Sequence, residues 1–419
     1  MTAVSRRSFI KAAGVATAAP FVIPAGALGA DGRASANSRL TLGFIGVGGM
    51  GSGHLGAFLG NREVQIQAIA EVDRVARERA RSSVENRYAR DTAAGAYKGC
   101  AAYNDFRDLL ARSDLDAVVI AVPDHWHAII ACAAARAGKD IYCEKPMTLT
   151  LREADVMVDT VRRHSRVFQL GSQQRSEANF RLACELVRSG RIGKVMTVHV
   201  GVGGPSAETY YPADPVPDGL DWDFWLGPAP WRPFSKKLHP FNWRDCRDFS
   251  GGGMTDWGAH HFDIAQWGLG MDGSGPVEVN PPDGKDYKTL TYKYANGVIM
   301  YHGGANGILF TGADGKIEVN RGYLRSWPDE IIRTPLGPGD VHLYRSKGHH
   351  QDWLEAIRAR SRPICDVEIG RGSINVCHLG NLAYWLNRPL KWDPAKRQFI
   401  GDAEATRWLD RPRRAVWRL

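Results

Sequence analysis

A lysine that follows a short apolar run is the first residue of this sequence that is placed to act on a bound substrate. Glu144-Lys145-Pro146 comes directly after the strand candidate Asp140 to Cys143. Residues at the carboxyl ends of parallel strands face the ligand crevice of a doubly wound sheet. An ammonium group in that position can donate a hydrogen bond to a substrate hydroxyl. An isolated lysine after a strand is more often a surface residue. A role for Lys145 in substrate binding therefore depends on other catalytic residues that act with it.

The run from Gly251 to Asp263 carries an acid and a histidine at helical spacing. If Asp256 begins a helix, Asp256 and His260 are four residues apart and share one face. A carboxylate beside an imidazole can orient it and raise its basicity, as a general base for alcohol oxidation requires. Lys145, Asp256 and His260 are therefore the candidate catalytic and substrate-binding residues.

Two other interpretations of this run stay open. Asp256 could simply cap a helix whose histidines are buried. Alternatively, Asp256, His260, His261 and the pair His349-His350 could converge on a metal ion. We assign no metal, because His260 and His261 are adjacent and point to different faces of a helix.

The loop from Gly46 to Gly51 (GVGGMG) matches a dinucleotide-binding fingerprint in its expected context. It follows the apolar run Leu40 to Ile45 and opens a helix. The first glycine permits the tight turn, the second lets the backbone approach the pyrophosphate, and the third allows close packing of helix on strand. We expect cofactor contacts from Gly46, Gly48, Gly49, Met50 and Gly51.

An acid stands where a ribose of the cofactor would bind. Glu71 lies 20 residues past Gly51, at the end of the second strand candidate. A carboxylate there favours NAD, since it would repel the 2′-phosphate of NADP, although nearby Arg74 leaves NADP open. Asp73 is the weaker alternative because it lies past the strand end.

A third segment, Val122 to His127 (VPDHWH), follows the fourth strand candidate and should line the nicotinamide side of the cofactor. We expect cofactor contacts from Pro123, His127 and Glu144. His125 is a weaker candidate, because a histidine at the start of a helix is often structural.

Strand and helix alternate in the part of the chain that carries these motifs. Strand candidates lie at 40–45, 64–70, 115–122 and 140–143, and helix candidates at 54–59, 73–90, 106–111 and 127–137. The 115–122 run is almost continuously apolar, as in a strand that is buried on both faces. The alternation predicts an α/β Rossmann domain with a parallel sheet over residues 39–165.

The pattern changes in the second part of the chain, where short alternating runs lie between residues 287 and 325. Asn296-Gly297 and Asp314-Gly315 are hairpin signals between these runs. Residues 166–390 are therefore predicted to form an α+β domain with a largely antiparallel open sheet.

Two further segments of the second part stand apart. Residues 204–250 are rich in Trp, Tyr and Pro and indicate a long ordered insertion, whose aromatic residues could line a sugar site or form a core. Residues 391–419 are interpreted as a C-terminal extension.

The first 36 residues resemble a twin-arginine export signal. Ser5-Arg6-Arg7-Ser8-Phe9-Ile10-Lys11 precedes a weakly apolar stretch that Ala, Gly and Pro interrupt too often for a membrane span. We expect export to the periplasm through the Tat translocase, which carries folded proteins, and no membrane span in the mature chain.

Composition excludes two classes of function. The chain of 419 residues carries a formal net charge of +9, but its basic residues are dispersed, so we expect no nucleic-acid partner. Its seven cysteines form no CxxC pair, which argues against a zinc ribbon or a disulfide framework.

Together, these motifs resemble the Gfo/Idh/MocA oxidoreductases, a family named for glucose–fructose oxidoreductase and inositol dehydrogenase. The matching segments are GFIGVGGMG (43–51), AIAEVD (68–73), AVPDHWH (121–127), AGKDIYCEKP (137–146), LGSQQRS (170–176) and GGGMTDWGAHHFDIAQW (251–267). The resemblance implies that Lys145 polarises a hydroxyl of a sugar or cyclitol and that His260 takes its proton with the assistance of Asp256. Hydride would pass from the ring carbon to the nicotinamide.

The resemblance also implies that Gln173 contacts the cofactor, that Arg175 contacts the substrate, and that the chain forms a homodimer or homotetramer. Family members often carry an aromatic or aliphatic residue and Asn before this arginine, whereas here the residues are Ser172, Gln173 and Gln174. This departure affects the sugar contacts more than the cofactor contacts.

Export and a dinucleotide cofactor together imply that the cofactor is resident. Since the periplasm is not expected to hold free NAD(H), we predict a cofactor that is loaded before export and recycled within the protein. The net reaction would be sugar–sugar exchange or glycoside cleavage through a transient ketone. A non-catalytic sugar- or cofactor-binding protein and a metal-dependent lyase or hydrolase stay open as alternatives.

Overall fold

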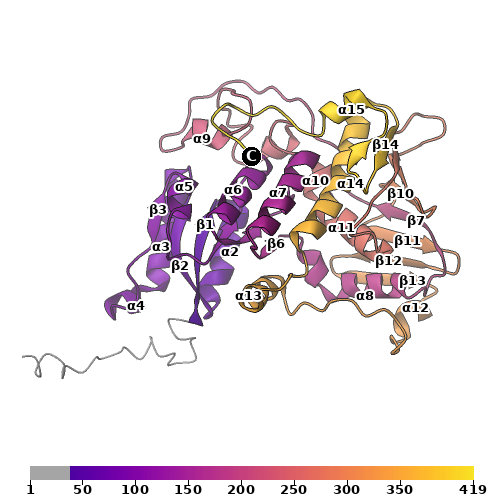
Figure 1. The fold of residues 1–419 in the computed structure, drawn as a ribbon, viewed down its shortest axis with the longest axis horizontal. Coiled ribbons are helices and arrows are strands. Elements are labelled where there is room, and N and C mark those ends of the chain that lie inside the picture. The colour runs from indigo at the N-terminus through magenta and orange to yellow at the C-terminus, as the bar shows by residue number, and fades with distance from the viewer. Residues whose placement is uncertain (1–37) are drawn as a thin grey trace, which may run out of the picture.

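The computed structural model describes residues 38–419, which form two domains side by side (Figure 1). The predicted export signal, residues 1–36, lies outside the described residues. Among the described helices, none combines the length and the apolar character that crossing a membrane requires.

The first domain is built on a six-stranded parallel sheet. Its strands are β1 (Leu40–Ile45), β2 (Val64–Ala70), β3 (Ala101–Tyr103), β4 (Ala117–Ile120), β5 (Asp140–Cys143) and β6 (Phe168–Leu170). They lie in the order β3-β2-β1-β4-β5-β6, and each neighbouring pair is parallel. This confirms the predicted Rossmann sheet, in which β1 and β4 are neighbours at the point where the strand order reverses.

Helices cover both faces of this sheet because its strands are apolar on both sides. The helices are α2 (Gly49–Gly60), α3 (Arg74–Arg87), α4 (Ala89–Ala93), α5 (Phe106–Leu110), α6 (Asp124–Arg136) and α7 (Leu151–Arg163). In β4, Val118 and Ile120 pack in the core that contains α5, α6 and α7, whereas Ala117 and Val119 pack with α2 and α3 on the other face. The nearly continuous apolar run thus reports two buried faces.

The sheet of the first domain extends beyond the predicted boundary at residue 165. β6 pairs with β5 in parallel and completes the sheet, but a three-residue strand is too short to give a periodic signal. A helix from much later in the chain, α13 (His349–Ala359), also belongs to this domain, because its Trp353 and Leu354 pack in the core with α2 and α3.

The second domain is built on a nine-stranded, mostly antiparallel sheet, as predicted. Its strands are β7 (Val195–Val200), β8 (Glu278–Asn280), β9 (Thr291–Lys293), β10 (Ile299–His302), β11 (Ile308–Gly312), β12 (Lys316–Asn320), β13 (Tyr323–Trp327), β14 (Leu390–Asp393) and β15 (Gln398–Phe399), in the order β13-β12-β11-β7-β10-β9-β8-β14-β15. β7 and β10 form the parallel pair. Both predicted hairpins are present: Asn296-Gly297 joins β9 to β10, and Asp314-Gly315 joins β11 to β12.

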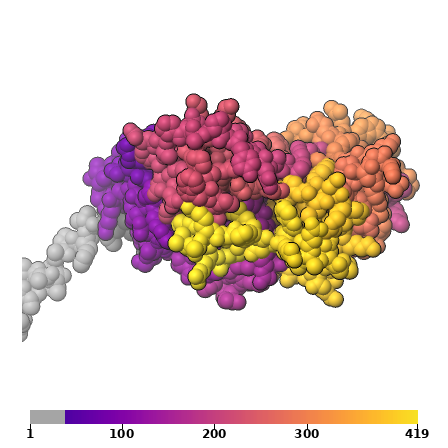
Figure 2. All heavy atoms as spheres, turned by 90° about the horizontal axis from the view of Figure 1, so that it is seen from above, coloured from indigo at the N-terminus to yellow at the C-terminus, as the bar shows by residue number. Residues whose placement is uncertain are grey.

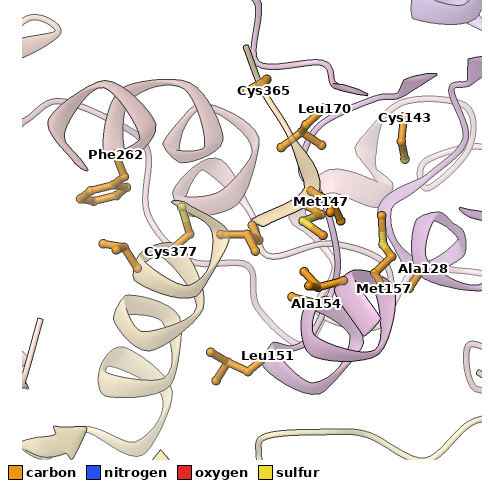
Figure 3. Close-up of a cluster of buried hydrophobic side chains, with 14 of the residues drawn as sticks. Ala128, Cys143, Met147, Leu151, Ala154, Met157, Leu170, Phe262, Cys365 and Cys377 are labelled. Carbon is orange, nitrogen blue, oxygen red and sulfur yellow. The ribbon is translucent and has the colours of Figure 1, made fainter. Parts of the chain in front are cut away.

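Helices complete the second domain. They are η4 (Gln173–Ser176), α8 (Ala178–Arg188), α9 (Trp222–Leu226), η5 (Asn242–Asp245), α10 (Gly253–Asp256), α11 (Gly258–Leu269), α12 (Glu330–Arg333), α14 (Val367–Leu386) and α15 (Ala403–Arg407). Figure 3 shows the junction, where Met147 and Leu170 of the first domain lie beside Cys365, Cys377 and Phe262 of the second. The two sheets therefore share one continuous apolar core.

The insertion at 204–250 is ordered and has an aromatic core of its own. Trp222, Trp225 and Trp243 are buried together, and the rings of Trp222 and Trp225 are stacked at 4.7 Å. Tyr210 and Trp231 are exposed. The buried tryptophans are thus structural, which decides a question that the composition left open.

The C-terminal extension is integral to the fold. Within 391–419, Trp417 packs edge-on against Trp126 of α6 at 4.7 Å and against Phe224 of the insertion at 5.2 Å. Figure 2 shows the yellow C-terminal segment lying against the rose-coloured insertion. The tail therefore holds the insertion onto the first domain.

Candidate active site

The glycine loop has the geometry that dinucleotide binding requires. Gly46 has φ of +83°, and a Cβ on it would lie 2.5 Å from the carbonyl oxygen of Ala121. A Cβ on Gly51 would lie 2.2 Å from the carbonyl oxygen of Gly46. Both positions therefore need glycine, one for the turn and one for the close contact of helix and strand.

The middle of the loop is open. A Cβ on Gly48 or on Gly49 would meet nothing within 4 Å. Gly48 caps α2 without a side-chain hydrogen bond, no acidic residue stands in the first turn, and Met50 is half-exposed. Free amides at a helix N-terminus attract an anion, so these residues fit the pyrophosphate of a dinucleotide.

Glu71 lies at the end of β2, as predicted, but its carboxylate is engaged. Its oxygens accept hydrogen bonds from the backbone N–H groups of Val47 (2.8 Å) and Asp73 (3.1 Å). Burial raises its pKa, an effect that these two hydrogen bonds oppose. Glu71 thus joins the glycine loop to the ribose position. Asp73, the weaker alternative, caps α3 through the N–H groups of Val75 and Ala76.

Lys145 and Asp256 meet from opposite domains. The Nζ of Lys145 lies 2.6 Å from Oδ1 of Asp256 and 3.3 Å from its carbonyl oxygen. Both side chains retain some exposure, 13% for Lys145 and 26% for Asp256. The ammonium group is therefore held in place and still accessible to a ligand.

The predicted pairing of Asp256 with His260 on one helix is wrong. α10 ends at Asp256 and α11 begins at Gly258, so the helical spacing is broken at Trp257. Asp256 binds Lys145 instead. His260 lies in the first turn of α11, and its Nδ1 is buried without a hydrogen-bond partner. Burial, together with the charge of Lys145, holds the pKa of His260 well below its usual range.

Glu144 is the centre of a buried polar network. Its Oε1 accepts hydrogen bonds from Nε2 of His54 (2.9 Å) and from the amide of Gln173 (3.0 Å). Nδ1 of His54 contacts Nε2 of His350 at 2.8 Å. Burial alone would raise the pKa of Glu144, but the hydrogen bond and charge of His54 outweigh it and lower the pKa. The network thus fixes the residue that precedes Lys145.

The two histidines predicted as cofactor contacts, His125 and His127, are buried. Pro123 caps α6, but His127 is 1% exposed, and its Nδ1 donates to the carbonyl oxygen of Pro146 at 2.6 Å. His125 is equally buried and is bonded to the carbonyl oxygen of Trp225. His127 therefore supports the turn that carries Lys145 rather than presenting itself to a cofactor.

Arg175 is not available to a substrate, which corrects its predicted role. Its guanidinium is 1% exposed and binds Asp263 (2.7 Å) and Asp272 (2.6 Å). It also lies 5.0 Å from the ring centre of Trp267. All its donor nitrogens are used in this buried cluster, because Asp263 of α11 and the loop after that helix close over it.

Asp124 is a candidate functional residue that the sequence interpretation missed. It belongs to the segment AVPDHWH (121–127), in which nothing distinguishes it from a helix-capping acid. It is 3% exposed, and its Oδ2 has no hydrogen-bond partner. Burial, with a further contribution from Asp256, raises its pKa to about 7, and the charges of Lys145 and Arg244 act in the opposite direction. A buried carboxyl group with a pKa near neutrality therefore interacts electrostatically with both members of the Lys145–Asp256 pair.

The alternative metal ligands do not come together. His261 binds the carbonyl oxygen of Gly201, His349 binds Ser176 and Leu170, and His350 contacts His54. Within residues 38–419, no group of three His, Cys, Asp or Glu side chains is spaced to hold an ion.

Comparison with protein families agrees with this geometry in both domains. Residues 40–172 match the model of the oxidoreductase family, NAD-binding Rossmann fold, and residues 185–419 match that of the oxidoreductase family, C-terminal alpha/beta domain. The chain belongs to the Gfo/Idh/MocA oxidoreductase family. The first match ends just past β6, as the sheet does.

Relatives within the family are distant. A glycosyl hydrolase family 109 protein of Shewanella baltica (strain OS185) is 30% identical over 210 residues, which cover 46% of this chain and 44% of that relative. The chain thus spans less than half the length of this relative. The myo-inositol 2-dehydrogenase of Thermotoga maritima is 26% identical over 270 residues, covering 61% of this chain and 69% of the relative. The crystal structure of aldose-aldose oxidoreductase from Caulobacter crescentus has the same fold, with a TM-score of 0.57, 20% identity, and coverage of 84% of this chain and 99% of that chain.

In this member of the family, the insertion crosses the edge of the sheet where a dinucleotide binds. The backbone N–H of Arg74 donates to the carbonyl oxygen of Gly219 (2.9 Å), and that of Asp221 donates to the carbonyl oxygen of Val72 (3.1 Å). The amide of Asn104 donates to the carboxylate of Asp221 at 2.8 Å. The insertion is thus fixed to the loops that follow β2 and β3, next to the ribose position.

Proposed function

We propose that this protein is an NAD-dependent oxidoreductase that acts on a secondary alcohol of a sugar, glycoside or cyclitol. The observation that carries the proposal is the position of Lys145 and Asp256, 2.6 Å apart at the carboxyl end of β5. They share the edge of the sheet with the open Gly48-Gly49 amides. Membership of an oxidoreductase family whose first domain is an NAD-binding Rossmann fold agrees with this assignment.

The residues divide the work of alcohol oxidation between them. Lys145, fixed by Asp256, donates a hydrogen bond to the substrate hydroxyl and stabilises the negative charge that develops on its oxygen. His260 is neutral because burial and the Lys145 charge depress its pKa. It is therefore ready to accept the hydroxyl proton. Bound NAD supplies the two-electron acceptor for the hydride of the carbinol carbon.

We further propose that the cofactor stays bound between turnovers. The middle of the insertion, residues 219–227, is held by the loops after β2 and β3 and by the C-terminal tail. Arg414 of the tail lies 2.5 Å from Asp223 and donates to the carbonyl oxygen of Gly227. A cover that is held by so many contacts would slow cofactor release. This supports the resident cofactor that export through the Tat translocase to the periplasm would require.

Glycoside cleavage through a transient ketone is the second candidate. Asp124 supplies a second acid–base group that interacts electrostatically with Lys145, and its pKa of about 7 lets it exchange a proton near neutrality. Oxidation alone needs one base, whereas elimination of an aglycone next to a ketone needs a further proton transfer. The family 109 glycosyl hydrolase among the relatives favours the same reaction.

Glu71 at the ribose position favours NAD over NADP, since a carboxylate would repel a 2′-phosphate.

Assembly as a dimer or tetramer is supported by one face of the second sheet, which is half-exposed in the single chain. This face carries Thr197, His199, Tyr301 and Leu309.

The test is to purify the full chain from periplasm, denature it and measure the nicotinamide absorbance of the released cofactor. The same preparation is then mixed with a panel of glycosides, and the products are analysed by mass spectrometry. Stoichiometric cofactor with either keto-sugars or redox-neutral products supports the proposal. Empty protein that requires added NAD would refute the resident cofactor, and bound cofactor without any product would favour a non-catalytic binding protein.

A further inference from the structure

An arginine from the second sheet reaches the candidate active site. Arg321 lies in the turn between β12 and β13, and its guanidinium is 4.7 Å from the ring centre of Trp257. The side-chain amide of Gln174 has one orientation in which both its oxygen and its nitrogen form hydrogen bonds. In that orientation, Nε of Arg321 donates to the amide oxygen of Gln174 at 3.1 Å. The amide nitrogen then donates to the carbonyl oxygen of His260 at 3.2 Å. The side chain of Gln174 thus links Arg321 to the backbone of His260, the candidate base.

The charge of Arg321 acts on the carboxylate of Glu177, but the two side chains do not form an ion pair. Lys145 has Asp256 as its partner, but no ion pair within residues 38–419 includes Arg321. The charge of Arg321 nevertheless affects the site. It lowers the pKa of His260, in addition to the larger effects of burial and of the Lys145 charge. A cation near the base that is not ion-paired is available to the anionic group of a ligand.

Arg321 lies on an exposed aromatic face. The indole of Trp257 is 43% exposed, and its ring centre is 6.1 Å from that of His260. An exposed ring beside a reacting alcohol offers a surface for the apolar face of a sugar ring. The planar guanidinium above the indole leaves its edge available to a carboxylate or a sulfate, which it can bind through two parallel hydrogen bonds.

A second arginine reaches the site from the insertion. Arg244 lies 4.4 Å from the ring centres of both Phe241 and Trp243, and no ion pair of the described chain includes it. Its charge acts on Asp124, the buried carboxyl that interacts electrostatically with the Lys145–Asp256 pair. Arg321 and Arg244 are therefore two cationic side chains without an ion-pair partner in the described chain that act electrostatically on groups of the site.

We propose that the substrate is an anionic saccharide, whose carboxylate or sulfate ester pairs with Arg321 while its ring lies against Trp257. This inference rests on the proposed function and names its substrate class. Binding of the anion would also relieve the repulsion that disfavours a protonated His260, so the base would become stronger when the acidic substrate is bound. A neutral sugar would leave the base weakened.

Binding is tested first, with the cofactor-loaded protein and calorimetry. The probes are matched methyl glycosides of the gluco, galacto and manno series, each as the neutral sugar, the uronic acid and the 6-sulfate. We expect at least one acidic member to bind about 10- to 100-fold more tightly than its neutral match, the range of a charge-assisted hydrogen-bonded contact. The uronate and sulfate arms show which anion is preferred.

Variants assign the preference to a residue. Arg321→Gln is expected to abolish the difference between acidic and neutral probes, and Arg321→Lys to restore part of it. Arg325→Gln is the matched control, because Arg325 is exposed on the adjoining strand β13 and stacks on Tyr323. Equal affinity for acidic and neutral members in all three series would overturn the proposal, as would an equal loss of both in Arg321→Gln.

Reduction of the bound nicotinamide in rapid mixing separates this inference from the proposed function. Selective binding of an acidic probe that Arg321→Gln removes, without cofactor reduction by any sugar, would support the anion site and refute the oxidoreductase. Reduction by neutral glycosides at the same kcat/KM as by their acidic matches would support the oxidoreductase and refute the anion site.

Discussion

Lys145 lies 2.6 Å from Asp256, and this ion pair decides which side chain remains to accept a proton. Asp256 is committed to the ammonium group, whereas His260 is buried, neutral and unpartnered at Nδ1. Asp124 is the third group, a buried carboxyl with a free oxygen. At this scale the chemistry depends on how burial and neighbouring charges separate the protonation states of three side chains.

Asp124→Asn is expected to change the pH dependence of the reaction. Because burial raises the pKa of Asp124 to about 7, the wild-type carboxyl is neutral below that pH and charged above it. The wild-type profile of kcat/KM should therefore inflect near pH 7, and the variant, which is fixed in a neutral form, should lack that inflection. Asp108→Asn, an exposed acid in the first turn of α5, is the control. An unchanged inflection in Asp124→Asn would contradict the prediction.

The helices α2, α10 and α11 contribute to the site through their ends. α2 begins at the glycine loop without a capping side chain, and its amides face the crevice. The break at Trp257 separates Asp256, at the end of α10, from His260 in the first turn of α11. Helix ends and interruptions therefore matter more to this site than helix faces.

The glycine loop gives a prediction at the scale of the element. Gly48→Ala should fold normally, because its Cβ meets nothing within 4 Å, yet it should lose most of the bound cofactor, because the methyl group would stand where the pyrophosphate approaches. Gly53→Ala, also open and inside the same helix, should keep the cofactor and gain up to about 1 kcal/mol of stability. Cofactor content and Tm are the measurements. Equal cofactor content in the two variants would rule out the assigned role of Gly48.

The whole molecule is held together by segments that return to an earlier domain. α13 packs in the core of the first domain, and Trp417 pins the insertion against Trp126 of α6. α14 packs between the two sheets. The arrangement of the two domains and the insertion therefore depends on these long-range contacts.

Trp417→Ala should accelerate cofactor release. The change removes the contacts of the tail with Trp126 and Phe224, so the tail and the insertion should open locally without unfolding the domains. We expect an increase of about tenfold or more in the release rate, measured by nicotinamide fluorescence after dilution, for a loss of about 1.4 kcal/mol or more. Trp392→Ala, buried in β14 against Phe399, is the control that destabilises the same domain without touching the insertion.

Acid should destabilise the protein through its buried histidines. Burial lowers the pKa of His349, His350 and His378 to about 4, below the unfolded value. The unfolded chain then binds protons that the folded chain does not, so stability is present above about pH 6.5 and is lost as the pH falls toward 4. Each such group contributes a loss of about 2 kcal/mol between pH 7.5 and pH 5.

His378→Gln tests this linkage by urea unfolding at the two pH values. The variant should lose about 2 kcal/mol less than the wild type between pH 7.5 and pH 5. Leu379→Ala, buried on the same helix, should lower stability at both pH values alike. A wild-type slope in His378→Gln would show that His378 does not titrate as its burial implies.

The sequence by itself determined most of the local structure. β1, β2 and β5 have the predicted bounds, and both predicted hairpins form, because periodicity and turn residues act over a few positions. The roles of Gly46 and Gly51 follow in the same way, since the tight turn is a local demand on the backbone. The largely antiparallel second sheet was also predictable from alternation.

The tertiary structure decided what each charged side chain does. Asp256 pairs with Lys145, 111 residues away, rather than with His260 on the neighbouring turn. Arg175, predicted to bind substrate, forms a buried ion pair with Asp263, and Arg321 stacks on Trp257 without any local signal in the sequence. Spacing along the chain fixes which residues share a helix turn, but burial and charge pairing between distant segments depend on how the two sheets pack together.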